Sequence, residues 1–147
     1  MKATIQRVKE ARVIINNRIN SAIYSGLLVY LGVKKGDTKK TGEQLAKKII
    51  KLRIFPDNNN KMNLSLQDIE GEILIVSQFT LYANCSRGHR PSFSGAENPE
   101  QAKNIYNEFV NYIKRQGIRV KTGEFGANMD IYSINHGPVT IQLKAES

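Results

Sequence analysis

One stretch organises the predicted fold: Gly71-Glu-Ile-Leu-Ile-Val-Ser-Gln-Phe-Thr-Leu-Tyr-Ala83, an apolar run that ends abruptly in hydroxyl and amide side chains. Ile73–Val76 is too short for a helix and is rich in β-branched residues, so it predicts a buried strand. Ser77, Gln78 and Thr80 follow where this strand leaves the core. Polar groups fixed at the end of a rigid strand are well placed to hold a ligand. The alternative is that they are ordinary structural groups bonded to neighbouring backbone.

The composition predicts one domain, residues 1–147, with a preference for polyanions. The chain carries 22 Lys and Arg against 13 Asp and Glu, a net charge of +9. Such an excess favours a polyanionic partner, of which nucleic acid is the commonest. The alternative is a solvated helix face, since several lysines cluster around one predicted helix. These are Lys34, Lys35, Lys39, Lys40, Lys47 and Lys48.

Cysteine usage and hydropathy indicate a cytoplasmic protein. Cys85 is the single cysteine, which excludes an internal disulfide framework, and the N-terminus lacks the apolar segment of a signal peptide. No apolar run approaches the roughly 20 residues that cross a membrane, so we expect a soluble chain. Cys85, His89 and His136 do not match a zinc spacing. We therefore expect no metal and no cofactor.

The N-terminal third predicts a β meander followed by a helix. The charged run at residues 9–12 interrupts the first strand and suggests a bend or bulge. The expected strands are Ala3–Ile15, Ile19–Tyr24 and Leu27–Val33. Asp37, Thr38 or Thr41 can cap a helix that ends near Leu52. Residues 56–60, a polar run of asparagines, are expected to form a hairpin tip.

The C-terminal half predicts a second helix and the remaining strands. Asn98 as a cap, Pro99 at the first helical position and Gly117 at the end mark the helix, whose apolar stripe should pack on a sheet. Strands are expected over residues 118–121, 129–134 and 139–143, with turns at 122–126 and 135–138. The predicted fold class is mixed α/β, with largely antiparallel sheets and two main helices packed on one side.

The segment between the organising stretch and the second helix, residues 84–95, has too much Gly, Pro and Ser for regular structure. It carries Arg87, His89 and Arg90 beside an aromatic residue, Phe93. This composition suits a loop that faces phosphates or stacks on bases. An ordinary basic surface loop is the alternative.

Common catalytic motifs are absent or incomplete. A Cys85–His89 nucleophile and base pair would require the two side chains to converge, which their spacing neither supports nor forbids, and a lone cysteine is usually inert. A Ser-His-acid triad lacks its Gly-x-Ser-x-Gly turn, and there is no Gly-rich phosphate loop with its lysine.

Two motifs remain, Val76-Ser-Gln-Phe-Thr-Leu-Tyr-Ala83 and Asn135-His-Gly-Pro-Val-Thr140. Further segments accompany them: Ala3-Thr-Ile-Gln-Arg-Val8, Gly26-Leu-Leu-Val29, Leu31-Gly-Val33, Leu52-Arg-Ile-Phe55, Lys61-Met-Asn-Leu-Ser65, Arg90-Pro-Ser-Phe-Ser-Gly95, Thr122-Gly and Phe125-Gly-Ala127. With these motifs the sequence closely resembles the D-aminoacyl-tRNA deacylase family over nearly its whole length. It departs in small ways, such as His136 where an acidic residue is frequent.

The resemblance implies a homodimeric hydrolase that cleaves the ester between a D-amino acid and the terminal ribose of tRNA. It implies that Gly137-Pro138, as a cis peptide, enters the site of the partner subunit and rejects L-aminoacyl-tRNA by backbone contact. Gly permits close approach and Pro makes the cis form accessible at about 0.5 to 1 kcal/mol. Glycine has no handedness, so glycyl-tRNA is an expected second substrate. A simple tight turn is the alternative for this dipeptide.

The resemblance also implies roles for individual residues. Ser77, Gln78, Phe79 and Thr80 would form the catalytic floor, with the Phe79 N–H stabilising the oxyanion and a water, rather than Thr80, attacking. Arg7 would hold the Gly-Pro segment, and Phe125 and Met129 would line a pocket for the terminal adenine.

Two rival functions stay open. The first is a non-catalytic RNA-binding module, suggested by the charge and by the loop from Arg87 to Phe93. The second is an enzyme of the same fold that removes L-amino acids from mischarged tRNA, which would need a trans Gly137-Pro138 peptide.

Overall fold

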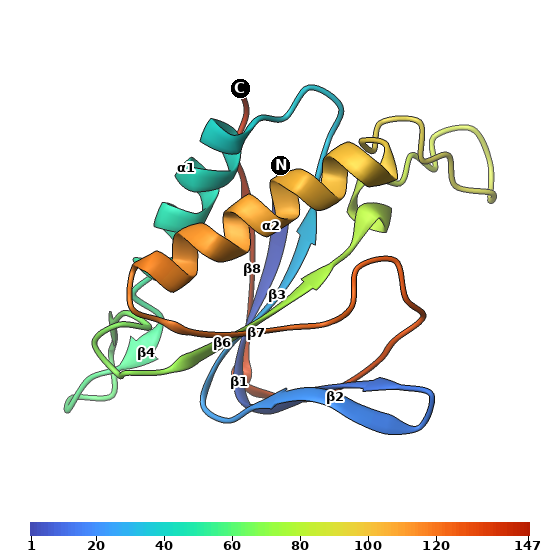
Figure 1. Cartoon of the computed structure of the whole chain (residues 1–147). Coiled ribbons are helices and arrows are strands. Elements are labelled where there is room, and N and C mark those ends of the chain that lie inside the picture. Colours follow the sequence, from blue (N-terminus) through green and yellow to red (C-terminus); the bar gives the residue numbers. More distant parts are fainter.

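In the computed structural model, which describes residues 1–147, strand β1 (Lys2–Ile15) lies at the centre of a bent sheet (Figure 1). One edge of β1 pairs antiparallel with β3 (Gly26–Gly32) and then with β2 (Arg18–Ile23). The other edge pairs antiparallel with β8 (Asp130–Lys144). The register with β8 shifts between Val8 and Glu10, so the expected irregularity at the start of the charged run is confirmed.

The rest of the sheet is parallel. Strand β6 (Glu72–Ser77) pairs with β3, and β7 (Arg119–Thr122) pairs with β6. The Ser21 hydroxyl of β2 donates to the carbonyl of Thr122 at 2.7 Å, which draws the two ends of the sheet toward each other. The result is a mixed, largely antiparallel sheet, as predicted. The sheet is also nearly barrel-like, which was not predicted. A separate hairpin joins β4 (Phe55–Pro56) and β5 (Met62–Leu64), and its tip lies in the predicted asparagine-rich turn.

The two helices begin at caps that the sequence predicts. Thr38 caps α1 (Lys39–Ile50), and its hydroxyl accepts from the N–H of Thr41 at 3.3 Å. Asn98 caps α2 (Pro99–Arg115) by accepting from the N–H of Gln101 at 3.0 Å. Both helices lie on the same face of the sheet, with α2 crossing in front of it (Figure 1).

Apolar side chains fill both sides of the sheet. The alternation of β3 sends Leu27, Val29 and Leu31 toward the helices, into a cluster of 25 buried residues. Leu28 points the other way, into a second cluster of seven buried residues. The seven are Val8, Ala11, Val13, Ile23, Leu28, Leu74 and Val76. Strand β6 is therefore buried on both faces and is held rigidly up to its last residue.

The predicted turn at residues 135–138 is wrong, because β8 runs through this segment as one strand. The Asn135 side chain accepts from the N–H of Val139 at 2.9 Å, and Arg7 Nε donates to the carbonyl of His136 at 3.0 Å. These bonds to side chains replace the missing ladder bonds. The segment forms a bulge, in which Val8 pairs with Asn135 while Gln6 already pairs with Thr140.

Candidate functional site

The organising stretch ends beside a pocket, as its polar residues suggest. The N–H of Gln78 donates to the carbonyl of Leu31 at 2.8 Å, so Phe79 is the first residue beyond this pairing. The chain then forms a single 3-10 turn, η1 (Phe79–Tyr82), which no pattern in the sequence predicts. Because β6 is buried on both faces, its end fixes the position of Ser77, Gln78 and Phe79.

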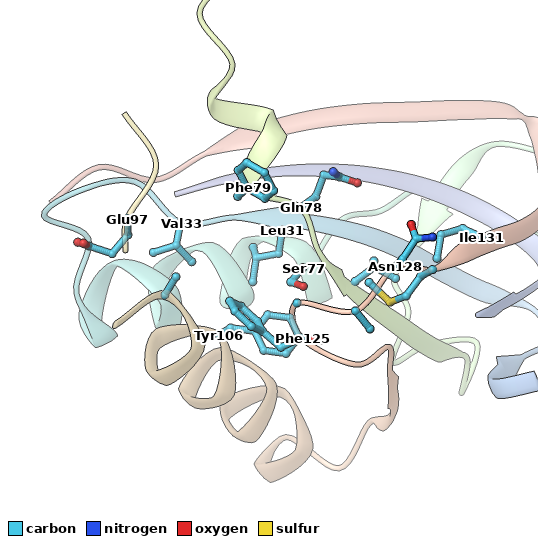
Figure 2. A pocket seen from close by; sticks show the side chains of 15 residues that line it. Leu31, Val33, Ser77, Gln78, Phe79, Glu97, Tyr106, Phe125, Asn128 and Ile131 are labelled. Carbon is cyan, nitrogen blue, oxygen red and sulfur yellow. The ribbon is translucent and has the colours of Figure 1, made fainter. Parts of the chain in front are cut away.

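The pocket has a volume of about 270 Å³ and lies between the end of β6, helix α2 and the segment before β8. It brings together five predicted site residues, which are Ser77, Gln78, Phe79, Phe125 and Met129. Figure 2 shows Gln78 and Phe79 on one side and Tyr106 with Phe125 on the other. The remaining lining residues are Leu31, Val33, Val76, Glu97, Ala102, Gly126, Ala127, Asn128 and Ile131.

An aromatic pair forms one wall of this pocket. The rings of Tyr106 and Phe125 lie 5.6 Å apart between centroids, tilted by 58°. The Tyr106 hydroxyl donates to the carbonyl of Ile75 at 2.7 Å, and burial raises the pKa of this hydroxyl. Tyr106 therefore stays neutral and acts as a fixed wall. The sequence predicts only that the apolar stripe of α2, which includes Tyr106, packs on the sheet, and the position of Tyr106 in that stripe carries no sign of a pocket.

Glu97 is the one carboxylate that lines the pocket, and its oxygens already accept hydrogen bonds from backbone N–H groups. Its oxygens accept from the N–H of Asn98 at 2.8 Å and from the N–H of Gly36 at 3.2 Å. These two bonds, that from Asn98 first, hold the pKa of Glu97 below its usual range. A carboxylate held in this way serves to fix loops, and it is a weak candidate for a general base.

Thr80 lies apart from the pocket lining. Its side chain is exposed at the start of η1, and its hydroxyl oxygen accepts from the amide of Gln78. A nucleophilic threonine needs an adjacent base, and no histidine or lysine contact to this hydroxyl is found. The geometry favours Thr80 as an orienting partner of Gln78.

Arg7, Gly137 and Pro138 form a second cluster on β1 and β8. The buried Arg7 donates to the carbonyl of His136 at 3.0 Å and, from Nη1, to the carbonyl of Ile54 at 2.8 Å. The Gly137–Pro138 peptide is cis, and Gly137 has a φ of +132°. His136, Gly137 and Pro138 are exposed. The chain thus presents this dipeptide on its surface and supports it from behind with a fixed guanidinium.

A single chain does not bring the two clusters together. Residues 136–139 lie opposite Arg7, which pairs with Leu27, which in turn pairs with Ile73 at the start of β6. Ser77 lies at the other end of β6. At ordinary strand spacings, residues 136–139 and Ser77 are therefore separated by about 13 Å along the strands and about 14 Å across them.

Other candidate groups were located as well. Cys85 is exposed, and no group of three or more His, Cys, Asp or Glu side chains is arranged to hold a metal ion. None of the helices is both long and apolar enough to span a membrane. Asn128 lines the pocket without having been predicted, because its segment carries no periodic signal.

Comparison with known proteins gives full-length matches. The sequence model of the D-Tyr-tRNA(Tyr) deacylase family matches residues 4–144. The D-aminoacyl-tRNA deacylase of Desulfatibacillum aliphaticivorans is 55% identical over 146 residues, which cover 99% of this chain and 100% of that protein. A solved structure described as "c-Myc DNA Unwinding Element Binding Protein" superposes with a TM-score of 0.93 at 41% identity, covering 100% of both chains. Another, "Structural Analysis of a probable eukaryotic D-amino acid tRNA deacylase", shares the fold with a TM-score of 0.84 at 17% identity over 97% of each chain.

Proposed function

Because the chain belongs to the D-Tyr-tRNA(Tyr) deacylase family, we propose that it hydrolyses the ester between a D-amino acid and the terminal ribose of tRNA. The observation that carries this function is the family match over residues 4–144, with the pocket at the end of β6 as its physical counterpart. The products are free tRNA and a free D-amino acid, so the enzyme acts in quality control of translation. We propose that it does so in the cytoplasm.

The pocket suits the terminal adenosine of the substrate. A volume of about 270 Å³ is just below the range of common ligand pockets, which is about 300 to 1,000 Å³. Phe125 and Met129 supply apolar surface for a base, and Asn128 and Gln78 supply amide groups at the rim. We propose that the adenine lies against Phe125 and Met129, which directs the ester toward Ser77, Gln78 and Phe79.

Backbone geometry then supplies the chemistry. The pocket lining contains no histidine, lysine or cysteine, so a covalent mechanism with an activated nucleophile has little support. We propose that the N–H of Phe79 stabilises the oxyanion that develops when water attacks the ester carbonyl. The 2′-hydroxyl of the terminal ribose would help to orient that water. Thr80 contributes indirectly, through Gln78.

Selection by handedness requires the second cluster. We propose that Gly137 and Pro138 of one subunit enter the pocket of the other in a homodimer and contact the α-carbon of the substrate with backbone atoms. Three observations support this: the dipeptide is exposed, Arg7 fixes it, and it lies far from the pocket of its own chain. Strand β8 also leaves its outer edge unpaired, with Tyr132 and Ile134 exposed to 51% and 44%.

The proposed substrate range follows from this filter. An L side chain would collide with the inserted backbone, a D side chain would point away, and glycine would pass because it has no side chain. The enzyme should therefore accept D-aminoacyl-tRNA and glycyl-tRNA and reject L-aminoacyl-tRNA. A backbone filter of this kind leaves the side chain free, so the enzyme should tolerate many D-amino acids.

A substrate panel tests the function. The protein is incubated with D-tyrosyl-tRNA, L-tyrosyl-tRNA and glycyl-tRNA, and loss of the ester is followed over time. We expect release from the D and glycyl forms and none above the spontaneous rate from the L form. Release from none of them would favour the RNA-binding module that the net charge of +9 also suits. Efficient release from the L form would contradict the filter.

A further inference from the structure

The segment from Asn84 to Ser92, here called the basic loop, is an ordered loop that projects beside the pocket. Asn84 and Ser92 exchange two backbone hydrogen bonds of 2.8 and 2.9 Å, which close the loop at its base. The N–H of Ser86 donates to the Asn84 side chain at 3.0 Å. Figure 1 shows the loop extending beyond the N-terminal end of α2, on the same side as the turn that follows β6.

The base of the basic loop is joined to the pocket. The ring of Phe93, the next residue, packs edge-on against Phe79, with 5.0 Å between centroids, and Phe79 lines the pocket. Further along, the N–H of Lys35 donates to the carbonyl of Gly95 at 3.1 Å. The loop therefore has a fixed position relative to the bound end of the proposed substrate.

The basic loop carries two arginines that have no ion-pair partner. Arg87 and Arg90 are exposed, and neither forms an ion pair. No Asp or Glu occurs from Ile73 through Ala96. Exposed guanidinium groups without acidic partners are suited to phosphate, which they bind through paired N–H donors.

We propose that Arg87 and Arg90 bind the phosphates of the single-stranded 3′ end of the tRNA, immediately before the terminal nucleoside. This proposal rests on the function proposed above, because that function places the terminal adenosine in the pocket. The phosphate of that nucleoside then leaves the pocket past Phe79 and Phe93, toward the loop. The loop thereby distinguishes a tRNA end from a free aminoacyl nucleoside, while the pocket reads the nucleoside itself.

The test compares substrates with and without these phosphates. The Arg87→Ala/Arg90→Ala variant is assayed on D-tyrosyl-tRNA and on 3′-O-D-tyrosyl-adenosine, which has no phosphate. We expect KM for the tRNA to rise roughly tenfold, with kcat and the hydrolysis of the adenosine ester within about twofold of wild type. The slope of log KM against log salt concentration should fall by about 1.4, as expected for two lost contacts to a single strand.

A matched control removes the same charge elsewhere. Lys47→Ala/Lys48→Ala deletes two exposed cations on α1, outside the pocket lining, and should leave KM for the tRNA within about twofold. An equal rise in KM in this control, or an unchanged KM and salt slope in the loop variant, would overturn the proposal. An equal loss on the adenosine ester would also overturn it, since the loop would then act on the pocket.

A binding measurement separates this proposal from the catalytic one. Fluorescence anisotropy with the unacylated RNA tetranucleotide ACCA reports phosphate contacts even in a protein without deacylase activity. We expect weaker binding in the loop variant, with an unchanged midpoint of thermal unfolding in both double variants. Equal affinity of wild type and the loop variant for ACCA would refute the proposal whatever the activity.

Discussion

At the scale of the residue, Gly137 is the one glycine with a positive φ at which an added side chain would also meet neighbouring atoms. A Cβ there would lie 2.9 Å from Arg7 Nη2 and 2.9 Å from Val139 Cγ2, on a backbone with a φ of +132°. Both the contact and the backbone region oppose any L residue. The guanidinium cannot retreat freely, because it is tied to the carbonyls of His136 and Ile54.

We therefore expect Gly137→Ala to destabilise the chain by about 2 kcal/mol and to displace Arg7. The unfolding midpoint in denaturant measures the first effect, and the second should nearly abolish the hydrolysis of D-tyrosyl-tRNA. Gly36→Ala is the matched control, since Gly36 also has a positive φ of +85° but no atom within 4 Å of the added Cβ. Equal destabilisation by the two substitutions would show that the contacts with Arg7 and Val139 have no effect.

Thr80 gives a second residue-scale prediction. Because its hydroxyl accepts from Gln78 and no base activates it, Thr80→Ala should retain at least about a tenth of wild-type kcat. Single-turnover hydrolysis of D-tyrosyl-tRNA measures this, and Thr80→Ser serves as the conservative control. Complete loss of hydrolysis with tRNA binding intact would identify the hydroxyl as the nucleophile.

At the scale of the element, the sequence predicted correctly those features that depend only on neighbouring residues, such as helix caps. Thr38 and Asn98 cap their helices as expected, because a cap depends on its own side chain and the next three residues. The turn assigned to residues 135–138 was wrong for the opposite reason. Asn135 bonds within the segment, but Arg7, 129 positions away, supplies the bond that holds it in the strand. No local pattern contains that information.

The candidate site divides in the same way. Ser77 and Gln78 could be predicted to lie at the pocket, since a polar ending on a buried strand is visible in the sequence, but Thr80 of the same ending lies outside the lining. The role of Phe79 came from the family resemblance. Tyr106 and Asn128 could not, because the pocket forms where α2 and a loop meet the end of β6. The site role of Phe125 and Met129 came from the family resemblance rather than from their spacing.

Glu97 links two elements, since it accepts from Gly36 before α1 and from Asn98 at the start of α2. These bonds, that from Asn98 first, lower the pKa of its carboxyl in the folded state. Its stabilising contribution is therefore present above the unfolded pKa and is lost as pH falls through the folded value. The difference in unfolding midpoint between wild type and Glu97→Gln should be largest near pH 7 and shrink below about pH 4.5.

Thermal unfolding followed by circular dichroism between about pH 3 and 7 measures this difference. Glu100→Gln is the control, because it removes a nearby exposed carboxylate, in the first turn of α2, for which no hydrogen bond or ion pair is found. A gap between wild type and Glu97→Gln that does not vary with pH would contradict the assigned role of the carboxylate.

At the scale of the whole molecule, the distance between the pocket and the Gly137-Pro138 cluster bears on the oligomeric state. The pocket and Gly137-Pro138 lie at opposite ends of the strand register, so one chain cannot use both on one ester. A twofold dimer in which each subunit completes the other's site resolves this, because a symmetric contact makes two identical sites. The proposed deacylase should then lose activity in any condition that yields a stable monomer.

Mixing inactive variants tests this arrangement directly. Ala127→Trp fills the pocket, and Gly137→Ala disturbs the dipeptide. Each homodimer should be inactive, but a heterodimer unites one intact pocket with one intact dipeptide from the other chain. After unfolding and joint refolding, an equal mixture should recover about a quarter of wild-type activity, since half the dimers carry one working site of two.

The double variant in one chain, refolded with wild type, supplies the opposite test. In a cross-subunit site, a heterodimer of wild type with Ala127→Trp/Gly137→Ala has no complete site, so activity should fall to about a quarter, that of the wild-type homodimers alone. If each chain instead completed its own site, the wild-type chain would stay active in every dimer and about half would remain. Measured side by side, the two mixtures should therefore give equal activity. Half in the second and none in the first would show that each subunit works with its own Gly137-Pro138.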